Sequence, residues 1–511
     1  MSIFCERSIR ALALSTMLVA ALHPQAVAED RPQWGEHHVR NMVSPETGLP
    51  SEFNPDTGQN IKWSADLGGN SYASPVIANG KVFIGANNDG ARDPRNTADC
   101  GVLLCLNESD GTLAWQLAVP RIGGDDYLDW PKIGMCSSPT VEGNRVYTLT
   151  NRYEVVCLDI EGQANGNDGP YVDEGAHMVP DGQPALEVTA TDADILWLVD
   201  LRTAVGMYPH DSAHTSILID GDVLYLNTCN GVDNTHKVIR KPDAPSLIAL
   251  DKATGRLLAQ DDEKMGHLIF HATWSPPALA QIDDKRVIVF GGPHGVCYGF
   301  EALTPATITN EVQTLKRVWR FDCDPTGPKE NVAEFLENRK VSPSIISSTP
   351  VIFDKQVFVT VGGDVWWGKE QSWLKCIDAT QTGDITATGE RWSYSIPGHC
   401  TATPSIANGL VFISDCTGLM HCVDAKTGVA YWTHEVGGEI WGSTLVADGK
   451  VYLGSRNKSV AVLAATQEKS VLATNKLNGP IASTPVAANG ILYINTLDTL
   501  YALDEGIAPK Q

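Results

Sequence analysis

Short segments of alternating apolar residues recur along most of the chain, for example KVFIG at 81–85, LVFIS at 410–414 and ILYIN at 491–495. Each of these segments follows a two-residue turn such as Asn408-Gly409 or Asn489-Gly490, and a stretch of small residues precedes the turn. Apolar alternation on both sides of an Asn-Gly or Asp-Gly pair is the strongest short-range signal for a β-hairpin. No segment keeps a helical period over more than two turns. The pattern therefore predicts an all-β protein.

The hairpin belongs to a longer repeat. Its turn pairs are Asn79-Gly80, Gly143-Asn144, Asp220-Gly221, Asp283-Asp284, Asp354-Lys355, Asn408-Gly409, Asp448-Gly449 and Asn489-Gly490. A third apolar strand then ends in a turn such as the Asp-Ala-Lys-Thr-Gly of residues 424–428, and a fourth strand often carries a tryptophan. Each unit thus predicts four antiparallel strands, here called A to D. The last turn-to-turn steps of 40 and 41 residues match one blade of a propeller.

Eight such units predict an eight-bladed β-propeller of four-stranded antiparallel blades, because radially packed sheets cover one another and leave few open edges. The eighth unit stops after its third strand, at Leu503, while a spare tryptophan strand at 61–67 precedes the first unit. We predict that residues 61–67 complete the last blade and close the ring. The expected division is a signal peptide at 1–28, an N-terminal extension at 29–60, the propeller at 61–504 and a tail at 505–511.

The first residues have the organisation of a secretory signal. Arg7 and Arg10 precede an apolar run at 11–22, and Ala26-Val27-Ala28 resembles a cleavage site. Cys5 lies before the apolar run, so it is not placed as the acylated cysteine of a lipoprotein. We expect a periplasmic or secreted protein, and a monomer, with no transmembrane segment. The formal net charge of -23 disfavours nucleic acid as a partner.

The succession Ser/Thr-Pro, Asn-Gly, Val-Tyr-x-Gly, Leu-x-Ala-Leu-Asp, Thr-Gly and Trp resembles the propeller repeat of the pyrroloquinoline quinone (PQQ) type. The resemblance covers residues 61–504 and is clearest between 401 and 504. The family includes quinoprotein alcohol dehydrogenases and non-enzymatic members like BamB. The resemblance to the dehydrogenases implies PQQ with calcium as cofactors, held against a tryptophan and a disulfide between adjacent cysteines. This sequence has no Cys-Cys pair and no Cys-x-x-Cys-His haem motif.

Strand order places turns A–B and C–D at one end of each blade and loops B–C and D–A at the other. Most long insertions fall in the B–C and D–A loops, which predicts that this face binds a ligand. Histidines and tryptophans gather in these loops. The ligand-binding candidates are His210, His214, His271, Trp274, His294, Trp366, Trp367, His399 and Trp441. Solvated or hydrogen-bonded loop histidines are the alternative interpretation.

Two candidate bonds follow from spacing. His210 and His214 are four residues apart along one loop (His-x-x-x-His) and form a candidate metal pair whose third ligand the spacing does not identify. Folding strands A and B about Asn408-Gly409 brings Cys400 nearly opposite Cys416, which predicts a disulfide.

The functional hypothesis is an exported, non-catalytic binding or assembly scaffold whose protein or small-molecule ligand binds the face of the B–C and D–A loops. The alternative is a PQQ-dependent oxidoreductase acting on alcohols or sugars. The absence of the Cys-Cys and haem motifs favours the scaffold over the enzyme.

Overall fold

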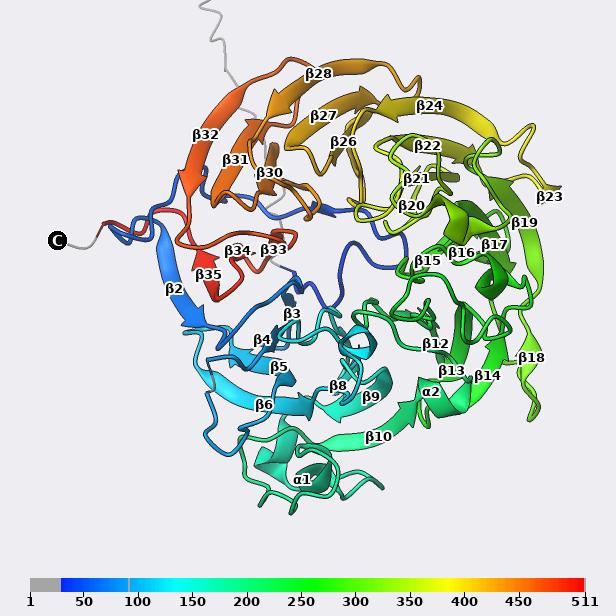
Figure 1. Ribbon diagram of the computed structural model, residues 1–511. Coiled ribbons are helices and arrows are strands. Elements are labelled where there is room, and N and C mark those ends of the chain that lie inside the picture. The colour runs from blue at the N-terminus through cyan, green and yellow to red at the C-terminus, as the bar shows by residue number, and fades with distance from the viewer. Residues whose placement is uncertain (1–28, 91, 510–511) are drawn as a thin grey trace, which may run out of the picture.

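The computed structural model describes residues 29–90 and 92–509, so the signal peptide predicted at 1–28 lies outside the described residues. Eight small antiparallel sheets stand around one axis and form a closed ring (Figure 1). The predicted eight-bladed propeller is confirmed. Within the described residues, no helix is long and apolar enough to cross a bilayer.

The first four blades contain strands A to D in chain order. They are β3 (Val76–Ala78), β4 (Lys81–Asn87), β5 (Cys100–Asn107) and β6 (Leu113–Pro120) in blade 1; β7 (Thr140–Glu142), β8 (Arg145–Leu149), β9 (Glu154–Asp159) and β10 (Ile195–Asp200) in blade 2; β11 (Leu218–Asp220), β12 (Val223–Asn227), β13 (Leu247–Asp251) and β14 (Leu257–Gln260) in blade 3; and β15 (Ala278–Ile282), β16 (Lys285–Gly291), β17 (Val296–Glu301) and β19 (Arg317–Asp322) in blade 4.

The last four blades repeat this order with shorter connections after blade 5. They are β20 (Val351–Phe353), β21 (Gln356–Gly362), β22 (Ser372–Asp378) and β24 (Glu390–Ile396) in blade 5; β25 (Ser405–Ala407), β26 (Leu410–Ser414), β27 (Leu419–Asp424) and β28 (Ala430–Glu435) in blade 6; β29 (Leu445–Ala447), β30 (Lys450–Gly454), β31 (Ser459–Ala464) and β32 (Val471–Lys476) in blade 7; and β33 (Val486–Ala488), β34 (Ile491–Asn495), β35 (Thr499–Leu503) and β2 (Ile61–Asp66) in blade 8.

The insertions add short elements outside the repeat. These are β1 (Val43–Ser44), β18 (Gln313–Thr314), β23 (Gly383–Asp384), α1 (Glu174–His177), α2 (Leu201–Ala204) and the 3-10 turns η1 (Asp126–Leu128), η2 (Gly162–Asn165), η3 (Met265–Leu268) and η4 (Val332–Phe335). Strands β18 and β23 pair in parallel with the outer strands of blades 3 and 4.

The ring closes where the sequence predicted. Strand β2 pairs antiparallel with β35, and Trp63 lies opposite Ala502. The N-terminal strand therefore supplies strand D of the last blade, so that the two ends of the propeller interlock (Figure 1).

The strand-D tryptophans join neighbouring blades. The indole N–H of Trp63 donates to the Glu108 carbonyl of blade 1 at 2.9 Å, and the N–H of Trp432 donates to the Thr466 carbonyl of blade 7 at 3.1 Å. The C–D turn of the next blade needs a glycine at this contact, because a Cβ on Gly111 would lie 2.6 Å from the Trp63 ring. The same contact relates Gly428 to Trp392. The repeated Trp and Gly of the sequence are thus two halves of one inter-blade contact.

The N-terminal extension lies across the centre of the ring, at the end of the A–B turns (Figure 1). Its main chain accepts hydrogen bonds from the innermost strands: Ile77 donates to Arg31, Val141 to Pro32, Leu279 to His38, Ile352 to Val39 and Val446 to Met42. Residues 31–42 therefore satisfy inner-edge N–H groups in five different blades, which would otherwise be unpaired. We call residues 29–49 the inner segment.

Candidate functional site

A small polar cavity of about 100 Å³ occupies the axis of the ring above the inner segment. Hydroxyl side chains from the start of strand A in successive blades make up much of its wall. The lining includes Ser74, Ser138, Thr215, Ser216, Ser347, Thr349, Thr401, Thr403, Ser443, Ser483 and Thr484. Trp34 of the inner segment lines one side, and Tyr72 and Trp441 line the side nearer the D–A loops. The recurring Ser/Thr of the repeat thus forms the wall of the channel.

Three tryptophans predicted as ligand contacts lie together on the face of the B–C and D–A loops. Trp366 comes from the B–C loop of blade 5, Trp274 from the loop before β15, and Trp441 from the loop before β29. The ring of Trp366 lies 5.9 Å from that of Trp274 and 6.1 Å from that of Trp441, edge to face in both cases. Trp441 also stacks on Tyr72 and carries the Arg456 guanidinium 4.3 Å above its ring. Trp366 is 45% exposed, so the cluster presents an indole to solvent.

Beside these tryptophans, three imidazoles from three loops meet in the interior. His210 precedes β11, His236 belongs to the B–C loop of blade 3, and His271 precedes β15. Their ring centroids are 4.8 Å apart for His210 and His236, 4.9 Å for His210 and His271, and 5.2 Å for His236 and His271. All three side chains are buried. We call this group the histidine cluster.

Two carboxylates flank the histidine cluster. Asp364 is buried and its Oδ2 lies 2.9 Å from Nδ1 of His271, while its Oδ1 accepts the backbone N–H groups of Trp366 and Trp367. Asp211 lies on the other side, with Oδ2 3.2 Å from Nε2 of His271. A single carboxylate therefore orients both the buried imidazole and the tryptophan loop.

These contacts set the protonation of the cluster. Burial alone would lower the pKa of His271, but the carboxylates of Asp364 and Asp211 raise it to about 9. Burial, reinforced by the charge on His271, lowers the pKa of His210 to about 3 and also lowers that of His236. Burial would raise the pKa of Asp364, yet the contacts with His271 hold it below the usual value. At neutral pH the cluster thus contains one imidazolium between two carboxylates.

The other predicted histidines lie apart from this cluster. His214 lines the central cavity, so the spacing from His210 does not bring the two rings to one centre. His294 is buried against Tyr298, with Nε2 3.0 Å from the hydroxyl, and burial lowers its pKa to about 3. His399 belongs to the loop before β25, where its carbonyl accepts the N–H of Cys416. Trp367 does join the cluster, with its ring 4.5 Å from that of His236.

The predicted Cys400–Cys416 disulfide is not formed, and both thiols are free. The hairpin aligns Cys416 with His399 rather than with Cys400, through the hydrogen bond from the N–H of Cys416. The thiol of Cys400 instead points to the Ser414 carbonyl at 3.1 Å. Simple counting from the turn fails here because regular pairing of the two strands ends at Ser405.

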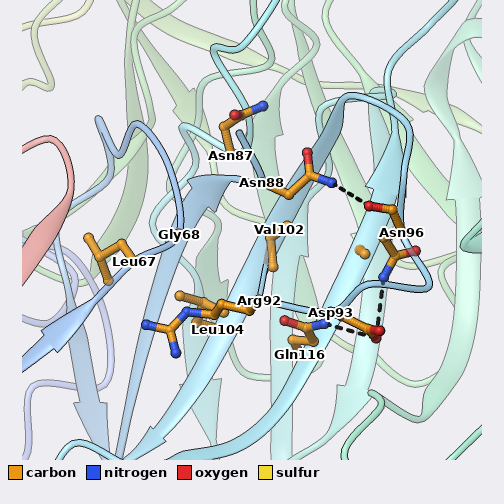
Figure 2. Close-up of a pocket in the computed structure, with 11 residues that line it drawn as sticks. Leu67, Gly68, Asn87, Asn88, Arg92, Asp93, Asn96, Val102, Leu104 and Gln116 are labelled. Atoms are coloured by element: carbon orange, nitrogen blue, oxygen red, sulfur yellow. Dashed lines mark hydrogen bonds between the residues drawn. The ribbon is translucent and has the colours of Figure 1, made fainter. Parts of the chain in front are cut away.

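A second cavity of about 10 Å³, the size of one water, lies between blades 8 and 1 (Figure 2). The polar residues around it already bind one another. Both carboxylate oxygens of Asp93 accept from Nε of Arg95. The side-chain amide of Asn88 donates to the Asn96 carbonyl (Figure 2). These hydrogen bonds stabilise the inserted loop.

Sequence reasoning identified His210, His271 and the tryptophans but missed the contacts that assemble them. Tyr127 stacks on His210 with ring centroids 5.8 Å apart, and Asp211 and Asp364 are the partners of His271. Asp364 immediately precedes Val365-Trp366-Trp367, so a carboxylate beside the tryptophan pair was the available signal. Its pairing with His271, 93 residues earlier, is visible only in the fold.

The family model for outer membrane protein assembly factor BamB matches residues 51–267 and 316–471, which is more than half of the chain. The chain belongs to this family. Membership confirms the resemblance to PQQ-type repeats inferred from the sequence. No curated protein sequence matches the chain.

Solved structures from both branches of the resemblance share the fold. BamB from Moraxella catarrhalis is 13% identical, with a TM-score of 0.50, over 88% of this chain and 98% of that one. A quinohemoprotein alcohol dehydrogenase from Comamonas testosteroni is 11% identical, with a TM-score of 0.58, over 96% of this chain and 83% of that one. A quinohemoprotein alcohol dehydrogenase from Pseudomonas putida HK5 is 13% identical, with a TM-score of 0.57, over 94% and 81%. At these identities the likeness shows the fold alone.

The residues around the central cavity do not fit PQQ. The quinone carries three carboxylates, whose burial requires cationic partners, and the cavity lining within the described residues contains no Lys or Arg. Its volume of about 100 Å³ is also well below the several hundred Å³ typical of cofactor pockets. On this face, the guanidinium of Arg456 covers the ring of Trp441, and that of Arg339 bonds to the Trp366 loop.

Proposed function

We propose that this protein is an exported, non-catalytic binding scaffold that takes its ligand or protein partner on the face of the B–C and D–A loops. The observation that carries the proposal is the exposed indole of Trp366, set among Trp274, Trp441 and the histidine cluster at the mouth of the channel. A few clustered aromatic side chains at the mouth of a cavity, with one of them exposed, are typical of a binding site.

The tryptophan loop is held in place before any ligand arrives. Asp364 accepts two backbone N–H groups of the loop, and the guanidinium of Arg339 donates to the carbonyls of Val365, Trp366 and Gly368. Binding to such a surface costs little conformational entropy, because the side chain and its loop need not be ordered. An indole adds a large apolar contact with only two rotatable bonds. The loop therefore supports recognition of an apolar side chain or ring.

The opposite end of the channel is occupied by the protein's own inner segment, and Trp34 of that segment lines the cavity. A ligand approaching the axis therefore meets the B–C and D–A loops. The family's printed description, an outer membrane assembly factor, supports a protein partner in the cell envelope. The sequence expectation of a cleaved signal supports a periplasmic or secreted location.

Site-directed photocrosslinking tests the proposal. A photoreactive phenylalanine analogue replaces Trp366 in one variant and Tyr431 in the other. Each variant is produced in the native cells and irradiated there, so that the proteins of the cell envelope are present. Tyr431 is 36% exposed on outer strand β28 and serves as the matched control. We expect one defined adduct from position 366 and none from position 431. Equal labelling at both positions, or none at position 366, would contradict the proposal that the B–C and D–A loops bind the partner.

The alternative quinoprotein oxidoreductase makes a separate prediction. Titration of the purified protein with PQQ and Ca²⁺, followed by absorbance, would show stoichiometric uptake and alcohol- or sugar-dependent dye reduction if the alternative holds. We expect neither, because the described residues that line the cavity offer hydroxyls and include no Lys or Arg.

A further inference from the structure

The histidine cluster has the features of a metal site. One ring nitrogen from each of His210, His236 and His271 lies within 4.8 Å of the other two. The three residues come from separate loops of blades 2, 3 and 4, so the fold and not local sequence brings them together. Three buried imidazoles at one point are costly unless their nitrogens find partners.

Three of the six ring nitrogens lack a well-formed hydrogen bond. Both Nδ1 and Nε2 of His210 are buried without a hydrogen bond of good geometry, although the ring comes near the carbonyl of Val232. Nε2 of His271 has only the 3.2 Å contact with Oδ2 of Asp211, which lacks good hydrogen-bond geometry, and Oδ1 of Asp211 is buried without a hydrogen bond. The unpartnered atoms belong to residues in contact, with Oδ1 of Asp211 3.7 Å from Nε2 of His210. They form a converging donor set of imidazole nitrogens and one carboxylate oxygen.

The outer contacts orient this set. Asp364 bonds to Nδ1 of His271 at 2.9 Å, which leaves Nε2 directed at the cluster. A carboxylate behind a coordinating imidazole is the usual arrangement around protein-bound metal ions, where it fixes the ring and raises its basicity. Asp364 is itself held by the N–H groups of Trp366 and Trp367. The oriented imidazole is therefore continuous with the tryptophan loop.

We propose that His210, His236 and His271, with Asp211 as the fourth ligand, bind one divalent transition-metal ion. Imidazole with one carboxylate suits zinc and similar borderline ions, whereas calcium and magnesium prefer sites made of oxygen alone. Tetrahedral zinc with bonds of about 2.0–2.1 Å requires nitrogen separations of roughly 3.3 Å. The three nitrogens lie within 4.8 Å of one another, so they must move closer to bind an ion, and no hydrogen bond of good geometry restrains His210.

The ion would tie together loops of three blades. It would also support the tryptophan loop through His271 and Asp364. The inference does not depend on the proposed partner-binding function, and its test uses no partner.

The test is calorimetric titration of chelator-treated protein with Zn²⁺, and separately with Co²⁺ while visible absorption is recorded. We expect one ion per chain and the intense visible bands of four-coordinate Co²⁺. His210→Ala should abolish stoichiometric binding. His267→Ala, at an exposed histidine 3.0 Å from Asp243, should leave the titration unchanged. Loss of binding in both variants, or no stoichiometric binding by the wild-type protein, would overturn the proposal.

A positioning role for Asp364 is tested separately, since Asp364→Asn keeps all four ligands. We expect metal affinity to fall by about 10- to 100-fold with the same Co²⁺ spectrum. In case His210→Ala fails to fold, pulsed electron paramagnetic resonance of wild-type protein loaded with Cu²⁺ counts the coordinated imidazoles directly. Three imidazoles support the site, and fewer contradict it.

Discussion

The two ends of the propeller channel are built from different kinds of sequence. At the A–B end, turns are minimal and the inner segment satisfies the inner strands through main-chain hydrogen bonds. At the opposite end, long loops place buried histidines, carboxylates and an exposed tryptophan around the axis. The first end combines main-chain bonds, which any residue could make, with a few buried side chains such as Arg40 and Asn41, whereas the second depends on particular side chains throughout.

This difference separates stability from recognition. Substitutions at the A–B end and in the blade contacts should destabilise the ring without a specific effect on ligands. Substitutions among the long loops should remove binding at a smaller cost to folding. The division follows from where the apolar burial lies, because the inter-blade core clusters are made of strand residues.

The largest effect is expected at the joint of the ring. Trp63→Ala removes a buried indole and its hydrogen bond to Glu108, which should cost about 3–5 kcal/mol of unfolding free energy. Trp432→Ala removes an equivalent contact inside the chain, to Thr466, and is the matched control. Denaturant unfolding should show the greater loss for Trp63→Ala, because terminal units of a repeat array fray more readily. Equal losses would mean that closure adds nothing.

Arg40 of the inner segment should give the next largest effect. Its guanidinium is fully buried and donates to the carbonyls of Trp34, Ser216 and Pro277, and burial lowers its pKa to about 9. Arg40→Met leaves these acceptors unpaired, which should cost about 3 kcal/mol. Thermal melting measures the loss, and Zn²⁺ titration at a temperature where the variant is folded should be unchanged. A variant as stable as the wild type would show that the inner segment is dispensable.

The fold was readable from the sequence because each blade repeats one local rule. Asn408-Gly409 and its equivalents fix hairpins, and the strand-D tryptophans fix contacts between blades. Closure was readable because one unit lacked a strand and Trp63 preceded the first. The path of the inner segment was not readable. Many of its bonds to the blades use main-chain groups, and its side-chain bonds come from single residues such as Arg40 and Asn41 that belong to no repeat, so the sequence shows no pattern for its path.

The candidate site was only partly readable for a related reason. The loops that carry His210, His271 and Trp366 were visible as insertions into the repeat, so the face could be predicted. Which histidines meet depends on how three loops fold back over the axis. Consequently His236 and Asp364 gained their roles from contacts between blades, while His294 turned out to pair with its neighbour Tyr298.

A smaller, pH-dependent effect is expected for Asp129, a buried carboxyl in the loop between β6 and β7. Burial raises its pKa to about 7, well above the unfolded value. The folded state therefore favours the protonated form, and wild-type stability should fall as pH rises from about 4 to 7. Asp129→Asn removes this pH dependence, because an amide does not ionise. Its oxygen can still accept the hydrogen bonds from Asn151 and Ile122.

Relative to the wild type, the Asp129→Asn variant should gain about 1.4 kcal/mol of unfolding free energy per pH unit between about pH 4 and pH 7, and nothing further above that range. Urea unfolding of both proteins at several pH values measures the difference. A difference that stays constant with pH would show that the buried Asp129 carboxylate does not destabilise the folded protein.

The smallest stability effect, and the sharpest test of the comparison, is expected for Trp366→Ala. Because the indole is 45% exposed, its removal should change the unfolding free energy by about 1 kcal/mol or less. The same change removes the apolar surface proposed for recognition, so partner capture should be lost while melting is nearly unchanged. Tyr431→Ala, at an outer strand, should alter neither property. If Trp366→Ala instead destabilises the protein as much as Trp63→Ala, Trp366 stabilises the fold. The proposed division between a stabilising end and a binding end of the channel would then be wrong.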